Sequence, residues 1–257
     1  MKKLLIQKLF NRIGLQVKPY PDPDLKRRLK IIHHYGVDTL LDIGAATGEY
    51  VEKMRECGYK NRIISFEPLK DSFSQLQKKA ARDKAWEIYN YALGSQEGRA
   101  TINVSSNSDS SSLLNMLPEH EAGEPLSRYV RQEEIEIKRL DSVYEGFCSP
   151  QAKVMVKIDV QGFEKSVLEG ANECLQSVGV IQLEMSLVPL YEQQPLFTEM
   201  IGYLSEKGFQ LFSLENGFAN LHTGQLLQVD GIFVKRETTR RKSGVQVRHA
   251  GHTGRNE

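Results

Sequence analysis

The sequence predicts an α/β fold: a mostly parallel sheet with helices on both faces. Short apolar, β-branched runs alternate with helical patterns from residue 37 onward, and this alternation is typical of βαβ units. The last two strand runs, 209–214 and 230–235, have no helix between them, so the final strand is expected to be antiparallel. With 257 residues and 40% hydrophobic content, the chain can bury one large core.

The individual elements follow from periodicity and from proline and glycine positions. Strands are expected at 37–43, 62–66, 86–92, 101–104, 135–140, 153–159, 178–185, 209–214 and 230–235. Helices are expected at 25–35, capped by Asp24, at 50–57, from Asp71 onward, at 163–168 and at 195–207. Residues 105–112 hold six serines in eight positions. The irregular segment 105–133 that they begin is interpreted as a lid near the substrate, with an ordinary surface loop as the alternative.

Charge divides the chain into three parts. Residues 1–20 carry five basic and no acidic side chains, and residues 238–257 carry five basic side chains and one acid. The net charge is +1, so the body between these ends is acidic, which argues against a nucleic-acid partner. We expect a helical N-terminal extension over 1–36, one domain over 37–237 and a basic, disordered tail over 238–257.

The N-terminus allows more than one interpretation. Leu5, Leu9 and Ile13 can form an apolar stripe flanked by basic side chains. This stripe fits a helix packed on the domain or on the second subunit of a homodimer, and it also fits a surface anchor over residues 1–18. Gln7 and Lys8 interrupt the apolar run that would make a signal peptide. We therefore expect a cytoplasmic protein, with contact to the inner membrane surface as an option.

The run Leu40 to Tyr50, LLDIGAATGEY, points to a bound nucleotide-like cofactor. An apolar strand ends at Asp42, turns through Gly44 and Gly48, and leads into a helix. Glycines let the backbone turn sharply and approach a ligand closely. A second apolar strand ends in Glu67, and an acid about twenty residues beyond such a turn commonly binds ribose hydroxyls.

Four acids are expected to meet at one edge of the sheet. Asp42, Glu67, Asp159 and Glu184 fall at the carboxyl ends of predicted parallel strands. Such a concentration of negative charge is costly unless a cation or hydrogen-bond donors face it. The loop also lacks the GxGxxG spacing of a dinucleotide site, and an acid at its start would oppose a pyrophosphate. These features favour S-adenosylmethionine, whose sulfonium and ammonium groups are cationic.

The sequence resembles the FkbM methyltransferases over roughly residues 37–236. The matching runs are LLDIGAATGEY (40–50), ISFEP (64–68), NYALGSQEG (90–98), SSSLL (110–114), IKRLDSV (137–143), VKIDVQGFEKSVLEG (156–170), LEMS (183–186) and VDGIFVKR (229–236). The resemblance implies a class I methyltransferase (Rossmann-like) fold with a seven-stranded sheet and an antiparallel last strand. It also implies S-adenosylmethionine as the methyl donor and O-methylation of a hydroxyl on a sugar, a glycan or a related natural product.

The cofactor-binding residues that we expect on these grounds are Asp42, Gly44, Ala45, Gly48, Glu67, Pro68, Tyr91, Ala92 and Asp159. This chain departs from the family at two positions. Members often have Asn where Ala46 stands, and the family's DVEGxE has Gln161 in place of the first glutamate. Glutamine keeps a hydrogen-bond acceptor but loses the charge.

Methyl transfer to a hydroxyl requires alignment of three atoms and removal of a proton. Asp159 is the first candidate for contacting the hydroxyl or acting as base, Glu184 the second and Glu164 the third. Structural roles are the alternatives for Glu184 and for Glu164, which would lie in the first turn of a helix. We expect no metal site, because the sequence shows no dense cluster of ligands.

The leading prediction is a cytoplasmic, S-adenosylmethionine-dependent O-methyltransferase acting on a small molecule or glycan. An NAD-dependent oxidoreductase on a similar sheet is one alternative. A non-catalytic protein that binds S-adenosylmethionine is the other.

Overall fold

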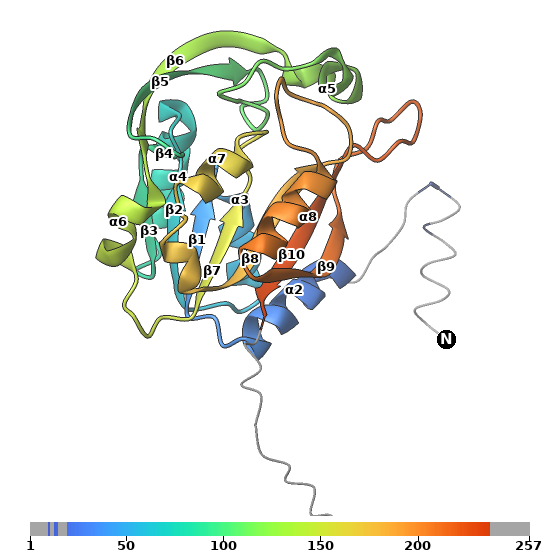
Figure 1. Ribbon diagram of the computed structural model, residues 1–257. Helices are drawn as coiled ribbons and strands as arrows, with labels where there is room; N and C mark the ends of the chain where they lie inside the picture. The colour runs from blue at the N-terminus through green and yellow to red at the C-terminus, as the bar shows by residue number, and fades with distance from the viewer. Residues whose placement is uncertain (1–9, 11–12, 15–19, 237–257) are drawn as a thin grey trace, which may run out of the picture.

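The computed structural model describes residues 10, 13, 14 and 20–236 (Figure 1). Its main sheet has seven strands, as predicted. In spatial order they are β3 (Trp86–Tyr89), β2 (Arg62–Phe66), β1 (Thr39–Ile43), β7 (Val154–Ile158), β8 (Val178–Ser186), β10 (Gln228–Lys235) and β9 (Phe209–Asn216). The first five are parallel to one another, and β10 is antiparallel to both of its neighbours. This is the expected class I methyltransferase arrangement, with the last strand reversed.

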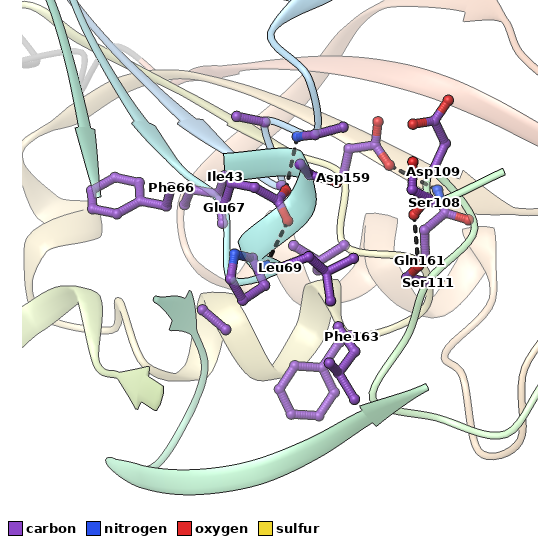
Figure 2. A pocket seen from close by; sticks show the side chains of 18 of the residues that line it. Ile43, Phe66, Glu67, Leu69, Ser108, Asp109, Ser111, Asp159, Gln161 and Phe163 are labelled. Carbon is purple, nitrogen blue, oxygen red and sulfur yellow. Dashed lines mark hydrogen bonds between the residues drawn. The ribbon is translucent and has the colours of Figure 1, made fainter. Parts of the chain in front are cut away.

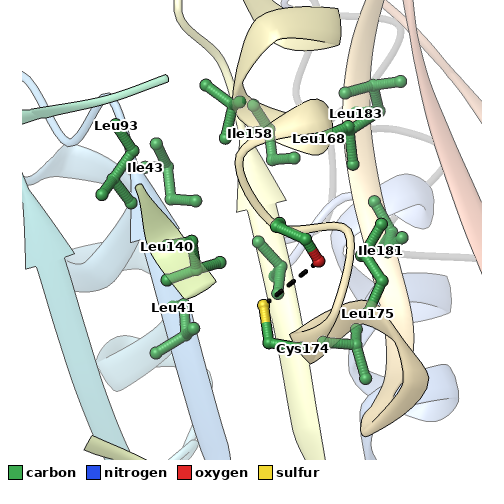
Figure 3. Packing of buried hydrophobic residues seen from close by; sticks show 14 of the residues in the cluster. Leu41, Ile43, Leu93, Leu140, Ile158, Leu168, Cys174, Leu175, Ile181 and Leu183 are labelled. Atoms are coloured by element: carbon green, nitrogen blue, oxygen red, sulfur yellow. Dashed lines mark hydrogen bonds between the residues drawn. The ribbon is translucent and has the colours of Figure 1, made fainter. Parts of the chain in front are cut away.

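Helices cover both faces of this sheet because successive strand residues point to opposite sides. One face packs against α2 (Pro23–His34), α3 (Glu49–Glu56) and α4 (Lys70–Ala80). The other packs against α6 (Leu140–Phe147), α7 (Glu164–Glu169) and α8 (Phe197–Glu206). Figure 3 shows this second layer, with Leu41 and Ile43 of β1 facing the same cluster as Leu140 of α6. Leu40, which precedes Leu41 in β1, points to the opposite side and belongs to the first layer.

A second sheet arches over one end of the first (Figure 1). It joins β4 (Ala92–Leu93), β6 (Tyr129–Lys138) and β5 (Gly98–Ser105), with β6 central. The segment between β5 and β6 contains helix α5 (Pro118–Gly123) and the 3-10 turn η1 (Pro125–Ser127), and a further 3-10 turn, η2 (Cys174–Gln176), precedes β8. The strand expected at 135–140 therefore begins earlier, and the irregular segment is shorter than predicted.

Two other local expectations were wrong. The strand expected over 86–92 breaks after Tyr89, because the Asn90 side chain donates hydrogen bonds to the carbonyls of Glu67 and Pro68. The cap of α2 is Asp22 rather than Asp24, since its carboxylate accepts hydrogen bonds from the amides of Asp24 and Leu25.

The predicted tail over 238–257 and nearly all of the proposed anchor over 1–18 lie outside the described residues. Within the described part of the chain, no helix is long and apolar enough to span a membrane. The three cysteines carry free thiols.

Candidate functional site

A cavity of about 340 Å³ lies where the main sheet meets the second sheet. Its walls come from the loops that follow β1, β2 and β7, from Glu184 of β8 and from residues of β4 and β5. Figure 2 shows Glu67 and Leu69 on one side of it, with Asp159, Gln161 and the serine-rich segment on another. The position agrees with the rule that ligands of open α/β sheets bind beyond the carboxyl ends of the strands.

The loop after β1 forms the floor because two glycines allow its path. Gly44 has a φ of 78°, and a Cβ there would stand 1.8 Å from the carbonyl oxygen of Asp159. Gly48, with a φ of 87°, is the N-cap of α3. The amides of Gly44 and Ala45 both donate to the carbonyl of Phe66, which ties the loop to β2. Gly44 and Ala45 line the cavity, whereas Gly48 supports the turn from behind.

Glu67 connects two loops at the cavity wall. Its Oε2 accepts a hydrogen bond from the Ala46 amide and its Oε1 accepts one from the Leu69 amide, each at 2.9 Å. Burial raises the pKa of Glu67 to about 8, although both amide bonds favour the ionised form. A cationic ligand in the cavity would therefore increase the negative charge on Glu67. Pro68 also lines the cavity.

A buried polar row crosses the α3 face of the sheet beneath this floor. Ser65, Asp42, Lys157 and Gln182 are register partners on neighbouring strands. Lys157 Nζ lies 3.4 Å from Asp42 Oδ1 and 3.3 Å from Asp159 Oδ2. Burial alone would lower the pKa of Lys157, but the two carboxylates outweigh it and raise that pKa. Lys157 is therefore a fixed positive charge at the cavity.

Asp42 itself does not line the cavity. It is fully buried, and Ser65 donates a hydrogen bond to its Oδ2 at 3.1 Å. Burial raises the pKa of Asp42, while Lys157 opposes that shift. Asp42 thus acts on the cavity through Lys157, by holding the ammonium group in place.

Asp159 and Glu184 are joined by one amide group. Gln161 Nε2 donates to Asp159 Oδ1 and to Glu184 Oε2, both at 2.8 Å. Gln228 donates to the same Glu184 oxygen, and Tyr191 donates its hydroxyl to Gln161 Oε1 at 2.8 Å. The Tyr191 bond orients the amide so that its NH₂ faces the two acids. Burial raises the pKa of Glu184 well above its ordinary value, and the Asp159 charge raises it further.

Of the remaining predicted site residues, Glu164 and Tyr91 lie outside the cavity and Ala92 lines it. Glu164 is buried outside the cavity, where its Oε1 accepts hydrogen bonds from the amides of Val160 and Gly162. Burial raises the pKa of Glu164 to about 7. Tyr91 packs against Phe66 in the core and does not line the cavity, whereas Ala92 does.

The serine-rich segment does reach the cavity. Ser108, Asp109 and Ser111 line it, and Ser112 donates its hydroxyl to the carbonyl of Gln161 at 2.6 Å. The start of the predicted lid is thereby tied to the loop that carries Asp159 and Gln161.

Residues 42–211 match the model of the methyltransferase FkbM domain, which is more than half of the chain. The chain belongs to the FkbM methyltransferase family. The methyl donor of this family is S-adenosylmethionine, as the sequence predicted. No curated protein matches the chain.

Solved structures similar to this FkbM chain include other methyltransferases. The methyltransferase FkbM from Methylobacillus flagellatus KT is 15% identical, with a TM-score of 0.47, and the match covers 76% of this chain and 43% of that one. The chain thus spans less than half the length of that protein. The Burkholderia thailandensis 1,6-didemethyltoxoflavin-N1-methyltransferase was solved with 1,6-didemethyltoxoflavin and S-adenosylhomocysteine. It is 10% identical, with a TM-score of 0.46, and the match covers 84% of this chain and 80% of that one. The precorrin-6y C5,15-methyltransferase from Geobacter metallireducens is 10% identical, with a TM-score of 0.43, and the match covers 85% of this chain and 91% of that one.

The two departures from the FkbM pattern have visible consequences. Ala46 has a φ of 46°, a left-handed conformation that asparagine adopts more readily than alanine. Gln161 supplies the donor that lies between two carboxylates, which a glutamate at that position would lack.

The sequence indicated no function for several of the residues that line the cavity, among them Lys157, Tyr50 and Asp109. The sequence pattern places Lys157 in a strand, Tyr50 in a helix and Asp109 in a polar segment. A lysine inside an otherwise apolar strand was the available signal, because such a lysine is buried only when paired. In the described part of the chain, no three His, Cys, Asp or Glu side chains are grouped as metal ligands.

Proposed function

We propose that this chain transfers the methyl group of S-adenosylmethionine to a hydroxyl of a sugar, a glycan or a related natural product. The charge of the cavity supports this most strongly. Lys157 is its one basic side chain among the described residues, and it is already paired with two carboxylates. The acidic side chains that line the cavity are Glu49, Glu67, Asp109, Asp159 and Glu184. This surface suits a sulfonium and an ammonium group and opposes the pyrophosphate of NAD.

The cavity also fits the cofactor by shape and donor set. The absence of a side chain at Gly44 lets the loop approach Asp159 closely, so the floor is backbone. We assign the ribose hydroxyls to Glu67 and the neighbouring Pro68 turn, and the adenine to the apolar wall at Ala92, Leu93 and Ile102. The methionine end would then lie toward Gly44, Ala45 and Lys157.

When bound, S-adenosylmethionine supplies an electrophilic methyl group. The residues of the chain align the acceptor and control its proton. We assign the contact with the acceptor hydroxyl to Asp159, which is partly exposed at the cavity, with Glu184 held beside it by Gln161. Glu164 holds the backbone turn that carries Gln161 and is assigned a structural role.

The test is a transfer assay with S-adenosylmethionine and a panel of mono- and oligosaccharides and polyketide-type alcohols. S-adenosylhomocysteine release and a methylated hydroxyl, detected by mass spectrometry, are expected for at least one acceptor. The Asp159→Asn variant should bind S-adenosylhomocysteine normally but lose most turnover. A chain that binds the cofactor yet methylates no acceptor would instead be a non-catalytic binding protein.

We place this reaction in the cytoplasm and retain two proposals for residues 1–18, contact with an anionic membrane surface or with a second subunit. Binding to anionic liposomes by the full chain, but not by a chain lacking residues 1–18, supports the membrane contact. A dimer of the full chain that becomes a monomer on the same truncation supports the subunit contact.

A further inference from the structure

A second cavity, of about 400 Å³, lies beside the first. The two cavities share Tyr50, Lys157 and Asp159 in their walls. The rest of the second wall comes from α2 and its N-cap Asp22, from Lys53 of α3, from β8 and β10, and from the end of β9. Its polar members include Arg28, Gln182, Glu215, Asn216 and Asp230. Methyl transfer requires two bound molecules to meet, and these shared residues are where occupants of the two cavities would meet.

Helix α2 is fastened to the domain as one wall of this cavity. The Arg28 guanidinium pairs with the Glu215 carboxylate of β9 and lies 5.1 Å from the centre of the Tyr50 ring. The Tyr50 hydroxyl donates to Gln182 Oε1 at 3.0 Å. These contacts order the wall that belongs to the N-terminal extension, and they neutralise Arg28 and Glu215 internally.

Asp230 differs from the other acids around this cavity. Asp22 caps α2, Asp24 pairs with Arg27, and Asp159 pairs with Lys157. Among the described residues, the one side-chain hydrogen bond of Asp230 comes from Gln182 Nε2, at 3.4 Å. Its position on β10 is directly opposite Glu184 on β8, so it lies on the same sheet face as the acid pair.

We infer that the second cavity binds the acceptor, an uncharged polyhydroxyl molecule, and that Asp230 takes the proton from the hydroxyl that is methylated. This inference rests on the proposed function. An uncharged acceptor fits because the other charged side chains of this wall are in ion pairs or cap α2, while amides and carboxylates remain to bind hydroxyls. In the step, the acceptor oxygen bonds to the methyl carbon, the carbon–sulfur bond breaks, and its electron pair converts the sulfonium to a thioether. The proton passes to the Asp230 carboxylate and then to solvent.

The charge environment of Asp230 suits a general base. Burial raises its pKa to about 6 and the Asp159 charge adds to that shift, while Arg28, the Gln182 amide and Lys157 oppose it. Glu184 also faces it from β8. A base with a pKa slightly below neutrality is ionised at pH 7 and still accepts a proton effectively.

The first test is Asp230→Asn, a change that keeps the shape of the side chain. We expect kcat to fall about a hundredfold or more, with the Kd of S-adenosylhomocysteine and the melting temperature unchanged. The wild-type kcat/KM should rise with pH through about 6, and this rise should be absent in the variant. An unchanged kcat in Asp230→Asn would overturn the assignment of the base.

The second test fills the acceptor cavity. Asn216→Trp should raise the acceptor KM at least tenfold and leave the Kd of S-adenosylhomocysteine unchanged. Lys26→Trp is the matched control, because Lys26 is exposed on α2 and lines neither cavity. Equal acceptor KM values for the two variants would place the acceptor elsewhere. If the wild-type chain methylates no acceptor, the proposed function fails and this inference fails with it, whereas wild-type-like variants overturn the inference alone.

Discussion

Glu67 Oε2 accepts a hydrogen bond from the amide of Ala46 at 2.9 Å, so the acid after β2 holds the loop after β1. The other oxygen of the same carboxylate holds the Leu69 amide. The carboxylate that we propose to bind the ribose hydroxyls therefore also fixes the shape of the loop. This hydrogen bond physically connects the two runs that predict a cofactor site, 40–50 and 64–68.

Glu67→Gln should weaken cofactor binding, because an amide NH₂ would replace one of the two acceptors that face backbone donors. We expect the Kd of S-adenosylhomocysteine to rise at least tenfold, about 1.4 kcal/mol, in calorimetry. Glu97→Gln, in an exposed turn, should leave the Kd unchanged. Equal affinities for the two variants would remove Glu67 from the cofactor site.

Ala46→Gly should stabilise the protein. Alanine at a φ of 46° carries a steric cost that glycine avoids, and after the greater entropy of unfolded glycine we expect a gain of about 0.5 kcal/mol. Urea unfolding would measure the change. Ala45→Gly is the control, because Ala45 does not have a positive φ and should only lose stability. A similar loss in both variants would show that no strain is stored at Ala46.

The order of the main-sheet strands and of most helices was predictable because it depends on local periodicity, whereas helices α5 and α6 were not predicted. The positions of the acids were predictable as well, since Asp42, Asp159 and Glu184 each follow or end an apolar run. The break at Asn90 was not, because a side chain bonding to carbonyls twenty-two and twenty-three residues away leaves no local pattern.

The different positions of the acids relative to the cavity could be seen only in the three-dimensional structure. Asp42 and Asp159 look equivalent in sequence, yet Lys157 lies between them and only Asp159 lines a cavity. The proximity of Asp230 to the acid pair could not be predicted from the sequence either. Its position opposite Glu184 depends on the antiparallel pairing of β10 with β8.

Gln161→Glu should destabilise the protein in a pH-dependent way. The change removes the donor between Asp159 and Glu184 and adds a third carboxylate, so we expect a loss of about 2 kcal/mol in unfolding free energy at pH 7. The loss should shrink as the pH falls toward 5, because protonation of one carboxylate restores a donor. Gln193→Glu is the matched control, since Gln193 also has a positive φ but is exposed. A loss independent of pH would contradict the charge explanation.

His120 should make the folded state sensitive to mild acid. Its ring is buried between Tyr191 and Phe218, and burial lowers its pKa from 6.5 to about 4. Between those two values the unfolded chain binds more protons than the folded one. The unfolding free energy should therefore fall as the pH drops from about 6.5 to 4, by on the order of 3 kcal/mol in total.

The His120→Phe variant isolates this effect, because phenylalanine fills the same space without titrating. Its unfolding free energy should depend less on pH across that window than that of the wild type. His33→Phe changes an exposed histidine and should keep the wild-type dependence. Identical pH dependence in all three proteins would exclude His120 as the source.

The central claim is that the loop after β1 and Glu67 form a site for S-adenosylmethionine. Its most direct test is calorimetry of S-adenosylhomocysteine and NAD with the wild type, Gly44→Ala and Gly58→Ala. Both glycines have positive φ, but a Cβ at Gly44 would clash with the Asp159 carbonyl, whereas one at Gly58 meets nothing within 4 Å. We predict that S-adenosylhomocysteine binds the wild type and Gly58→Ala, that Gly44→Ala loses this binding, and that NAD binds none of them. Binding of NAD in place of S-adenosylhomocysteine, or normal S-adenosylhomocysteine binding by Gly44→Ala, would contradict the claim.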